Sequence, residues 1–428
     1  MRRCIKSVIA GLLTFAILGT MGCGKKQEQE STYTFSPRLD TQKKITLSAT
    51  GFFGNFEALD QVTNDFNEYY PNVEFSYEQV SVQNYENYME ANPNVDIIMT
   101  SEEVFEKYGD KVTNNCVDLS KEDVNVSSLD SRMLAREYHN GQLLSIPIGQ
   151  NMYGLVVNVS LLEKEGLTVP DNYEEFLNVL KVLKSKGYTP IQGPNSKIYA
   201  ELTQGMAYDM IMNDKTLYDN LKSGNVSAAD ALKPVYDKLD TLISNGYIDY
   251  EVNKSYPDDN YDKAILKFFE GNVPFWVCNT EKVSGMKKRE SKSETYQAAP
   301  FKYTYIHAPL GDNGVYAYSE PWFGFGVNKN SNNYDYAVEF MRFMSTTDES
   351  NKMADIKGVP SIAVKNTDVA IYQDVLNPKK TEMSYINDGT ITQSISTNWY
   401  TSINKYSSGE IKSGREALEY FVKLCGGK

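Results

Sequence analysis

The chain has few residues suited to metal binding or nucleophilic catalysis. It contains only two histidines, His139 and His307, which lie far apart, and neither has a cysteine or an acidic motif at ligand spacing beside it. Zinc enzymes and Ser-His-Asp catalysis are therefore poorly supported, because both need histidine within a cluster. We expect no metal and no cofactor.

Positive charge is also in short supply. The 43 Lys and Arg residues face 56 Asp and Glu residues, which gives a net charge of −13. A non-specific nucleic-acid binder needs a basic surface, so we expect no nucleic-acid partner. Apolar residues at 41% and charged residues at 23% are typical of a folded globular protein. A length of 428 residues is enough for two or three lobes.

The apolar run near the N-terminus is too short to span about 30 Å of hydrocarbon. It covers residues 8–18 and follows a basic segment, which is typical of an export signal. It ends in Thr-Met-Gly-Cys at residues 20–23. This ending resembles a bacterial lipobox, although Thr stands where Leu is preferred. We predict a signal peptide over 1–22 and lipid attachment at Cys23, with ordinary cleavage and a free Cys23 as the alternative.

The segment after the signal is polar and has no apolar period. Residues 23–42 are therefore predicted to be a flexible tether. The remaining cysteines are Cys116, Cys278 and Cys425, an odd number without the spacing of a disulfide framework. They can form at most one disulfide, and buried free thiols are favoured.

Strands alternate with helices at the start of the folded part. We predict strands over 45–50, 73–78 and 95–100, and an amphipathic helix over 57–69 between the first two. This order indicates a mostly parallel sheet with right-handed crossovers.

The same analysis extends to the C-terminus. A helix is predicted to begin at Asp171, with Glu174 at the capping-box position, and the C-terminal helix at Ser413, with Glu416 in that role. Trp276 lies within a predicted strand and is assigned to the core. The other predicted elements are strands over 154–159, 273–278 and 323–328, helical stretches within 199–250, 258–270 and 334–345, and a loop over 282–293.

The order and wording of these segments resemble the bacterial extracellular solute-binding proteins of family 1, the maltose-binding-like subunits of ABC sugar importers. The most specific stretch is 141–191, which matches the pattern G-x-x-x-x-x-P … N-x-x-L-x-x-x-G-L-x-x-P-x-x-x-x-E-F … G-x-x-P-I nearly throughout. FFEGNVPFWVCNTEK at 268–282, WFGFGVNKNSNNYDYAVEFMRFMST at 322–346 and SSGEIKSGREALEYF at 407–421 extend the resemblance along the chain.

The resemblance implies an α/β, two-lobed periplasmic-binding-protein-like fold of class II, with a hinge of crossing strands and a cleft between the lobes. The crossings are expected near 148–154, 322–326 and 358–363. Lobe 1 would comprise 43–150 plus 323–360, and lobe 2 would comprise 151–322 plus 361–428.

The resemblance also implies a receptor outside the cytoplasm and no catalysis. Such a protein captures a carbohydrate, here expected to be an oligosaccharide, by hinge closure and delivers it to ABC permease subunits. We expect a monomer held by its lipid on the outer face of the cytoplasmic membrane, and the tether favours a Gram-positive-type surface.

A sugar site needs planar polar side chains and aromatic platforms, placed where strands end or cross. Candidates chosen by position are Phe52, Asn55, Glu102, Asn151, Asn279, Glu281, Glu320 and Trp322. Tyr199 and Trp399 are added by resemblance, as stacking aromatics. The competing roles are packing for the tryptophans, turn or cap contacts for the asparagines, and solvated surface positions for the glutamates.

Other functions are compatible with this sequence. A secreted glycosidase needs two carboxylates about 5–9.5 Å apart, and Glu102, Glu281 and Glu320 could supply a pair, but no catalytic motif is recognisable. The same fold could instead bind a peptide, a polyamine or a metal. The two histidines argue against a metal, whereas the acidic candidates suit a cationic ligand.

Overall fold

The first sheet begins with β1 (Ile45–Gly51), in which Leu47 and Ala49 turn one face into the core. A computed structural model describes residues 34–54, 56–256, 260–364, 370–376, 379, 381–386 and 389–427. The strand order is β2 (Val73–Gln79), β1, β3 (Ile97–Thr100), β12 (Gly324–Val327) and β6 (Ile146–Pro147). The first three strands are parallel, and β12 runs antiparallel to β3 and β6.

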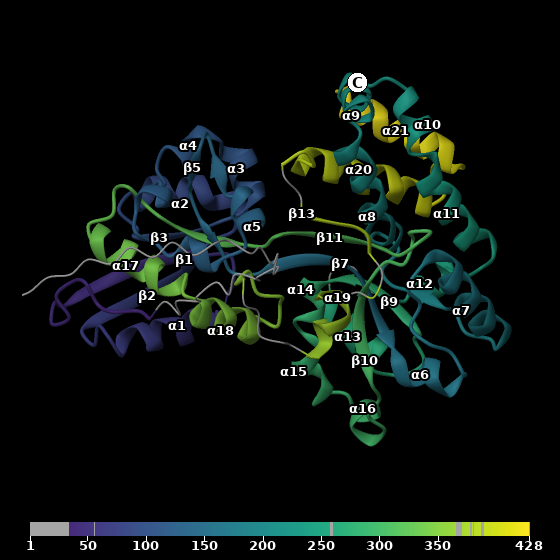
Figure 1. Ribbon diagram of the computed structural model, residues 1–428, viewed down its shortest axis with the longest axis horizontal. Coiled ribbons are helices and arrows are strands. Elements are labelled where there is room, and N and C mark those ends of the chain that lie inside the picture. Colours follow the sequence, from purple (N-terminus) through teal and green to yellow (C-terminus); the bar gives the residue numbers. More distant parts are fainter. Residues whose placement is uncertain are drawn as a thin grey trace, which may run out of the picture. The chain divides into compact units, whose positions relative to one another are not determined.

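Helices from two distant parts of the sequence surround this sheet. They are α1 (Glu57–Asn67), α2 (Tyr85–Ala91), α3 (Glu102–Tyr108), α4 (Asp110–Thr113), α5 (Ser131–Ala135), α17 (Tyr334–Met344) and α18 (Thr347–Lys357). Figure 1 shows α17 and α18 in light green beside the purple and blue elements, so the chain returns to this sheet after building the second. A short hairpin of β4 (Tyr138–His139) and β5 (Gln142–Leu143) turns at Asn140-Gly141, both with positive φ.

The second sheet is built around β7 (Gln150–Asn158), whose last five residues are all buried. One side of β7 pairs with β9 (Phe275–Asn279), and the other pairs with β11 (Val315–Pro321) and then β10 (Tyr303–His307), all antiparallel. β8 (Ile191–Gln192) lies parallel to β9, and β13 (Thr381–Ile386) parallel to β11. The expectation of a mostly parallel sheet is therefore correct for the first three strands of the chain and wrong for this one.

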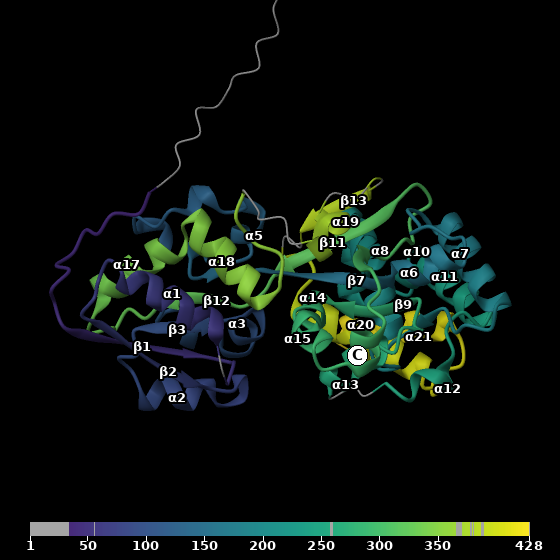
Figure 2. The same cartoon turned by 90° about the horizontal axis from the view of Figure 1, so that it is seen from below.

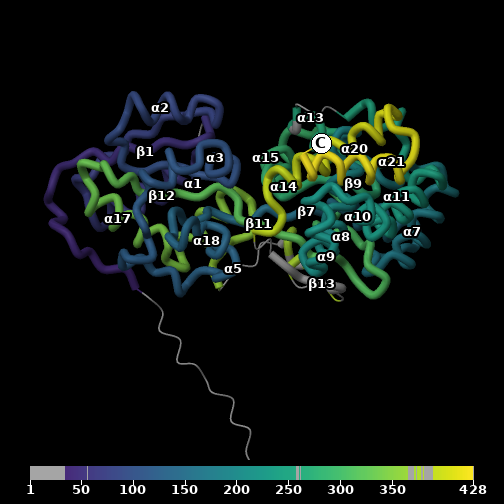
Figure 3. Tube along the Cα trace, turned by 90° about the horizontal axis from the view of Figure 1, so that it is seen from above, coloured from purple at the N-terminus to yellow at the C-terminus, as the bar shows by residue number. Residues whose placement is uncertain are grey.

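The helices around the second sheet include the C-terminal pair. They are α6 (Val159–Lys164), α7 (Tyr173–Ser185), α8 (Ile198–Asn213), α9 (Lys215–Ser223), α10 (Ser227–Ala231), α11 (Lys233–Ser244), α12 (Tyr250–Asn253), α13 (Tyr261–Phe268), α14 (Thr280–Val283), α15 (Met286–Glu290), α16 (Glu294–Ala298), α19 (Gln373–Leu376), α20 (Gln393–Ser407) and α21 (Gly414–Cys425). Figures 2 and 3 show α20 and α21 in yellow among the teal helices. No helix in the described ranges is long and apolar enough for a membrane span.

Two chain segments cross between the two sheets and a third lies beside them; the three are hydrogen-bonded to one another and are named the crossing segments. The Ile148 amide donates to the Phe323 carbonyl at 2.8 Å, and the Trp322 amide donates to the Gly149 carbonyl at 3.0 Å. The Gln150 amide donates to the Pro360 carbonyl at 2.8 Å. The first two lie where crossings were predicted. The crossing predicted near 358–363 is not found there, because Ile362 still belongs to the core of the first sheet and the Val364 amide donates to the Ser128 carbonyl.

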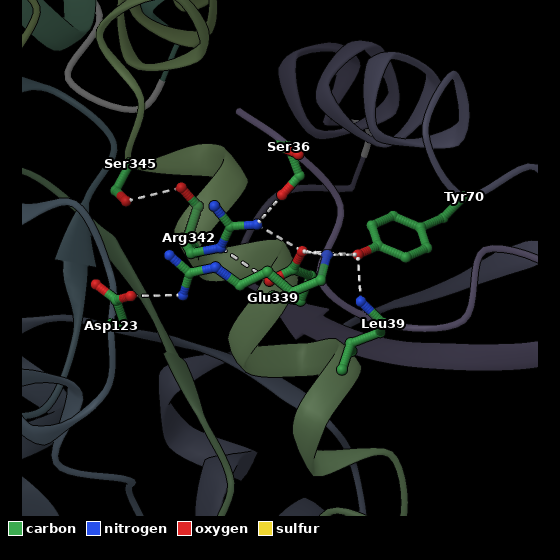
Figure 4. A network of polar contacts seen from close by, with 8 residues as sticks. Ser36, Leu39, Tyr70, Asp123, Glu339, Arg342 and Ser345 are labelled. Atoms are coloured by element: carbon green, nitrogen blue, oxygen red, sulfur yellow. Dashed lines mark hydrogen bonds and ion pairs between the residues drawn. The ribbon is translucent and has the colours of Figure 1, made fainter. Parts of the chain in front are cut away.

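The segment before β1 packs against α17 and is not free. The Phe35 ring is buried, and the Arg342 guanidinium lies 4.2 Å from its centroid. Arg342 also donates to the Ser36 carbonyl and to the Glu339 carboxylate, both at 2.6 Å (Figure 4). The predicted tether over 23–42 is therefore wrong at its C-terminal end, because Phe35 belongs to the hydrophobic core around the first sheet.

Tyr70 completes the cluster of polar groups around Glu339. The Tyr70 hydroxyl donates to Glu339 at 2.6 Å and accepts from the Arg38 amide at 3.0 Å. Burial and the Glu339 carboxylate raise the pKa of Tyr70 to about 12. Burial alone would raise the pKa of Glu339, but hydrogen bonds from Arg342 and Tyr70 outweigh it and leave that pKa below its ordinary value.

Local predictions succeeded where the chemistry is local. The Ser413 hydroxyl caps α21 by accepting from the Glu416 amide, and Trp276 is buried in the core, as predicted. The cap of α7 is Asn172 and not Asp171, because Asn172 accepts from the Glu175 amide. The predicted loop over 282–293 instead contains α15 and the end of α14. Cys116 and Cys278 are buried free thiols, and Cys425 is a half-buried one.

Candidate functional site

A pocket of about 480 Å³ lies beside the crossing segments and takes its walls from elements of both sheets. The first sheet's elements contribute the start of α3 and the residues after α5, and the second sheet's contribute β7, β11, α8 and α20. The lining includes charged, polar and aromatic side chains. They are Glu102, Glu103, Arg136, Glu137, Asn151, Tyr153, Lys197, Glu201, Asn279, Glu281, Tyr318, Glu320, Trp322, Phe323 and Tyr400.

Glu320 on β11 is the centre of a polar cluster on one wall. Its Oε1 accepts from the Tyr153 hydroxyl at 2.8 Å and the Asn151 amide at 3.4 Å, and its Oε2 accepts from the Tyr318 hydroxyl at 2.8 Å. Asn151 also donates to the Tyr153 hydroxyl oxygen at 2.9 Å. Strand geometry explains the grouping, since residues two apart on β7 and on β11 face the same side. A carboxylate has about four acceptor positions, so three donors fix Glu320 and leave room for one more.

The opposite wall carries a buried charge cluster. Glu102, the first residue of α3, forms an ion pair with Arg136 at 3.2 Å. Glu137 is 6% exposed and accepts from the Ser145 hydroxyl. Burial raises the pKa of Glu137 to about 7 and also raises that of Glu102, against the opposing effect of Arg136. Burial therefore favours the protonated form of both carboxyl groups compared with exposed glutamates.

Glu201 lies on α8 among the lining residues and is only 4% exposed. Burial raises its pKa to about 7, although Lys197 and Lys282 act in the opposite direction. Tyr400 on α20 also lines the pocket and donates to Gln204 at 3.0 Å. Both helices thus present polar groups to the same cavity.

Aromatic rings form the part of the lining nearest the crossing segments. Trp322 and Phe323 line the pocket, with ring centroids 5.2 Å apart, and Phe53 packs behind them at 5.5 Å and 5.2 Å. The Lys357 ammonium lies 4.1 Å from the Phe53 centroid and 5.4 Å from that of Trp322. A half-buried Trp322 offers an apolar face to a ligand while its other contacts hold it in place.

The structure brings six of the ten predicted ligand contacts to this pocket. They are Glu102, Asn151, Asn279, Glu281, Glu320 and Trp322. Asn279 also caps α14 by accepting from the Lys282 amide at 3.3 Å, so the cap role and the lining role coincide. Direct contact of these six with a ligand stays a prediction.

The other four predicted contacts lie elsewhere. Phe52 packs between Tyr85 and Phe323 outside the lining, and Asn55 lies outside the described residues. Tyr199 is 4% exposed and belongs to the hydrophobic core around the second sheet. Trp399 is fully buried in the same core, against Tyr208, Tyr236 and Phe421. The prediction that Trp399 stacks on a ligand does not agree with this burial.

Several lining residues were not predicted, and the strand period could have found two of them. Tyr153 and Tyr318 stand two positions from Asn151 and Glu320 along their strands, which places them on the same faces. Tyr400 is the neighbour of Trp399, and only the phase of α20 decides which of the two faces the pocket. Glu137 and Glu201 gave no signal, because a single Glu in a sequence is normally a surface residue.

The chain is similar to a known protein family and to a curated relative. The family of bacterial extracellular solute-binding proteins matches residues 61–378, well over half of the chain. The "Multiple sugar-binding protein" of Streptococcus mutans serotype c is 23% identical over 240 residues, 54% of each chain, so the match spans about half the length of that curated relative.

Solved structures share the fold at low identity. MalE, the sugar-binding protein of Xanthomonas citri, superposes with a TM-score of 0.69 at 14% identity, covering 90% of this chain and 97% of that chain. RafE in complex with raffinose superposes with a TM-score of 0.66 at 17% identity, covering 90% and 100%; RafE is a protein of Streptococcus pneumoniae. These matches show the two-lobed α/β fold. The extent of the family match shows that this chain belongs to the bacterial extracellular solute-binding proteins.

Proposed function

We propose that this protein is an extracytoplasmic receptor that captures a carbohydrate, in particular an oligosaccharide, and delivers it to the permease subunits of an ABC importer without chemical change. The observation that carries the proposal is the pocket beside three crossing segments, lined from both sheets by aromatic, amide and carboxylate side chains. Its volume of about 480 Å³ lies within the usual range for small-molecule sites.

The chemistry of the lining suits a sugar. Hydroxyl groups need planar acceptors and donors in fixed positions, which Glu320 and Asn151 provide because each is already held by neighbours. The C–H face of a sugar ring needs an aromatic surface, which Trp322 offers. The names of similar proteins support this choice, since the relative from Streptococcus mutans is a sugar-binding protein and RafE is solved with raffinose.

Capture would proceed by closure about the crossing segments. A ligand bound to one wall gains contacts with the other only when the lobes approach, so ligand binding shifts the protein towards its closed form. Moving such an equilibrium from 1:99 to 99:1 requires about 5.5 kcal/mol of differential affinity. Several desolvated hydrogen bonds and one stacked ring are sufficient for this.

Calorimetric titration of residues 35–428, one compact unit, with mono- and oligosaccharides tests the proposal. We expect saturable binding, with mass spectrometry showing the glycan unchanged. Trp322→Ala should weaken binding about tenfold or more, the loss of an aromatic contact and its buried area. Trp276→Phe is the matched control, because that residue lies in a core away from the lining. Cleaved glycan would identify a glycosidase, and no binding of any sugar would refute the substrate class.

We also propose attachment through a lipid on Cys23, which lies outside the described residues, with the receptor a monomer on the outer face of the membrane. The lipobox-like segment supports the attachment. In cells fed an alkyne-labelled fatty acid, Cys23→Ser should abolish labelling, whereas Cys4→Ser, within the signal, should retain it. Label retained in Cys23→Ser would refute the anchor, and light scattering of the purified protein tests the monomer.

A further inference from the structure

The pocket lining has an imbalance of charge. Six glutamates line it, and only two cationic side chains do: the acids are Glu102, Glu103, Glu137, Glu201, Glu281 and Glu320, and the cations are Arg136 and Lys197. Arg136 is already paired with Glu102 at 3.2 Å. The lining therefore keeps a surplus of negative charge that its own cations do not balance.

Most of these carboxylates have partners within the protein. Glu320 accepts from three donors, Glu137 accepts from Ser145, and Glu281 pairs with Lys282 at 3.2 Å. Glu201 differs from them. Among the described residues, no side chain or amide forms a hydrogen bond or ion pair with its carboxylate, although the residue is only 4% exposed.

The surroundings of Glu201 do not supply the missing partner. Lys197 on α8 and Lys282 on α14 attract the carboxylate from a distance, but Lys282 is engaged with Glu281, which repels Glu201. The Tyr400 hydroxyl on α20 donates to Gln204 instead. A carboxylate on a residue this little exposed is poorly solvated, and this one lines a cavity from which a ligand can reach it.

The two groups that a sugar can offer have different effects here. A hydroxyl donates one hydrogen bond and leaves the negative charge of the wall in place. A protonated amine donates up to three hydrogen bonds and cancels a charge, and hydrogen bonds between ions are about twice as strong as neutral ones. The neighbouring aromatic Tyr400 adds to the preference, since a cation is attracted to a tyrosine ring.

Resting on the function proposed above, we propose that the natural ligand is a saccharide bearing a protonated amine, and that the Glu201 carboxylate is the counter-ion of this amine in the bound state. Glu201 would thus determine specificity between amino sugars and neutral sugars of the same size.

Titration with matched pairs of saccharides tests the assignment. Each pair shares linkage and length and differs only in carrying an amine or a hydroxyl at carbon 2 of each unit, for example glucosamine and glucose trimers in β-1,4 and in α-1,4 linkage. The same titrations use Glu201→Gln, which keeps the shape of the side chain, and Glu270→Gln, which removes one exposed charge away from the pocket. Spermidine is included as a cation without a sugar.

We expect the wild type to prefer an amino sugar to its neutral counterpart by about tenfold or more, the worth of a hydrogen bond between charged groups. Glu201→Gln should remove most of this preference and leave neutral sugars nearly unaffected, while Glu270→Gln retains it. Equal affinity for both members of every binding pair, or a preference unchanged by Glu201→Gln, would overturn this inference and leave the carbohydrate receptor standing. If spermidine binds and no sugar does, the ligand is a non-sugar cation, and both the carbohydrate receptor and its specificity for amino sugars are refuted. If nothing binds at all, both proposals are refuted as well.

Discussion

At the residue scale, the partnerless carboxylate of Glu201 also makes the folded state sensitive to pH. Its pKa is raised by burial from 4.5 to about 7. In the unfolded chain the group loses its proton near 4.5, so stability declines as pH rises from 4.5 and the loss is complete above 7. A shift of this size corresponds to about 3 kcal/mol at most.

Glu201→Gln should therefore stabilise the ligand-free protein at alkaline pH and have little effect below pH 4.5. Urea unfolding at a series of pH values measures this directly. Glu137, whose pKa is also raised to about 7 by burial, should keep part of the pH dependence in the variant. Glu270→Gln should behave as the wild type. An unfolding free energy that Glu201→Gln leaves unchanged at alkaline pH would show that the carboxylate is not disfavoured in the fold.

Residue-level prediction from sequence depended on how each position is constrained. Glu320 and Asn151 could be chosen because they stand at the predicted crossing, and the strand period then determines Tyr153 and Tyr318. Trp399 was chosen and Tyr400 missed, because a helix facing a core on one side and a pocket on the other has polar and aromatic residues on both. Trp399 and Tyr400 are adjacent on α20, so a pattern that locates the buried face only to within one residue cannot tell the core position from the pocket position.

At the element scale, the contact of residues 35–39 with α17 depends on one buried ion pair. The Arg342 and Glu339 side chains are 3% and 5% exposed and 2.6 Å apart. Arg342→Ala should lower the free energy of unfolding by about 3–5 kcal/mol, because Glu339 would keep a buried charge without its counter-ion. Chemical denaturation measures this loss.

The matched control is Arg415→Ala on α21. The pairs of Arg415 with Asp230 and Glu419 are exposed, so this substitution should change the free energy of unfolding far less than Arg342→Ala does. Equal losses for the two arginines would contradict the role given to burial.

The limits of prediction at this scale follow from the range of the interactions. Caps and amphipathic faces depend on residues three or four apart, so α21 and β1 could be predicted within one or two residues. The pairing of β7 with β9, β10 and β11 depends on contacts across more than a hundred residues, which no local pattern encodes. The burial of Phe35 likewise depends on Arg342 and Phe343, which stand far from it in the sequence.

At the scale of the whole molecule, the crossing segments leave no room beside Gly149. A methyl group there would lie 2.5 Å from Cγ2 of Val359 and 3.2 Å from the Pro360 carbonyl oxygen. Gly149→Ala should lower the free energy of unfolding by about 1–3 kcal/mol, the usual cost of overpacking, and should weaken ligand binding because the crossing is displaced. Adding Val359→Ala should restore both quantities in part. Failure of this rescue would show that the Val359 side chain is not the obstacle.

Two side-chain contacts join helices around the first sheet to helices around the second. The Gln393 amide of α20 donates to the Glu106 carboxylate of α3 at 2.7 Å, and Lys288 of α15 lies 3.6 Å from Glu57 of α1. Removing both acceptors by Glu106→Ala with Glu57→Ala should favour the open form. We expect a larger radius of gyration without ligand by small-angle X-ray scattering, and affinity weakened about fivefold, since exposed pairs contribute about 1 kcal/mol.

A double variant with the same change of charge controls for electrostatics. Glu251 and Glu270 are exposed and lie outside the pocket lining, so Glu251→Ala with Glu270→Ala should leave size and affinity unchanged. A radius of gyration that stays the same in the Glu106→Ala, Glu57→Ala variant would show that these contacts do not hold the closed form.

The packing of Phe35 against α17 would also limit the distance between a lipid anchor at Cys23 and the folded protein. With an anchor at Cys23, only the twelve residues 23–34 separate the lipid from the first buried side chain. At about 3.4 Å per residue this leash cannot exceed about 40 Å. The receptor would then search a thin layer above the bilayer, at a local concentration far above its average in the cell. Because this segment joins the chain at the first sheet's core, an anchor at Cys23 would restrain the first sheet's elements directly and the second sheet's elements only through the crossing segments.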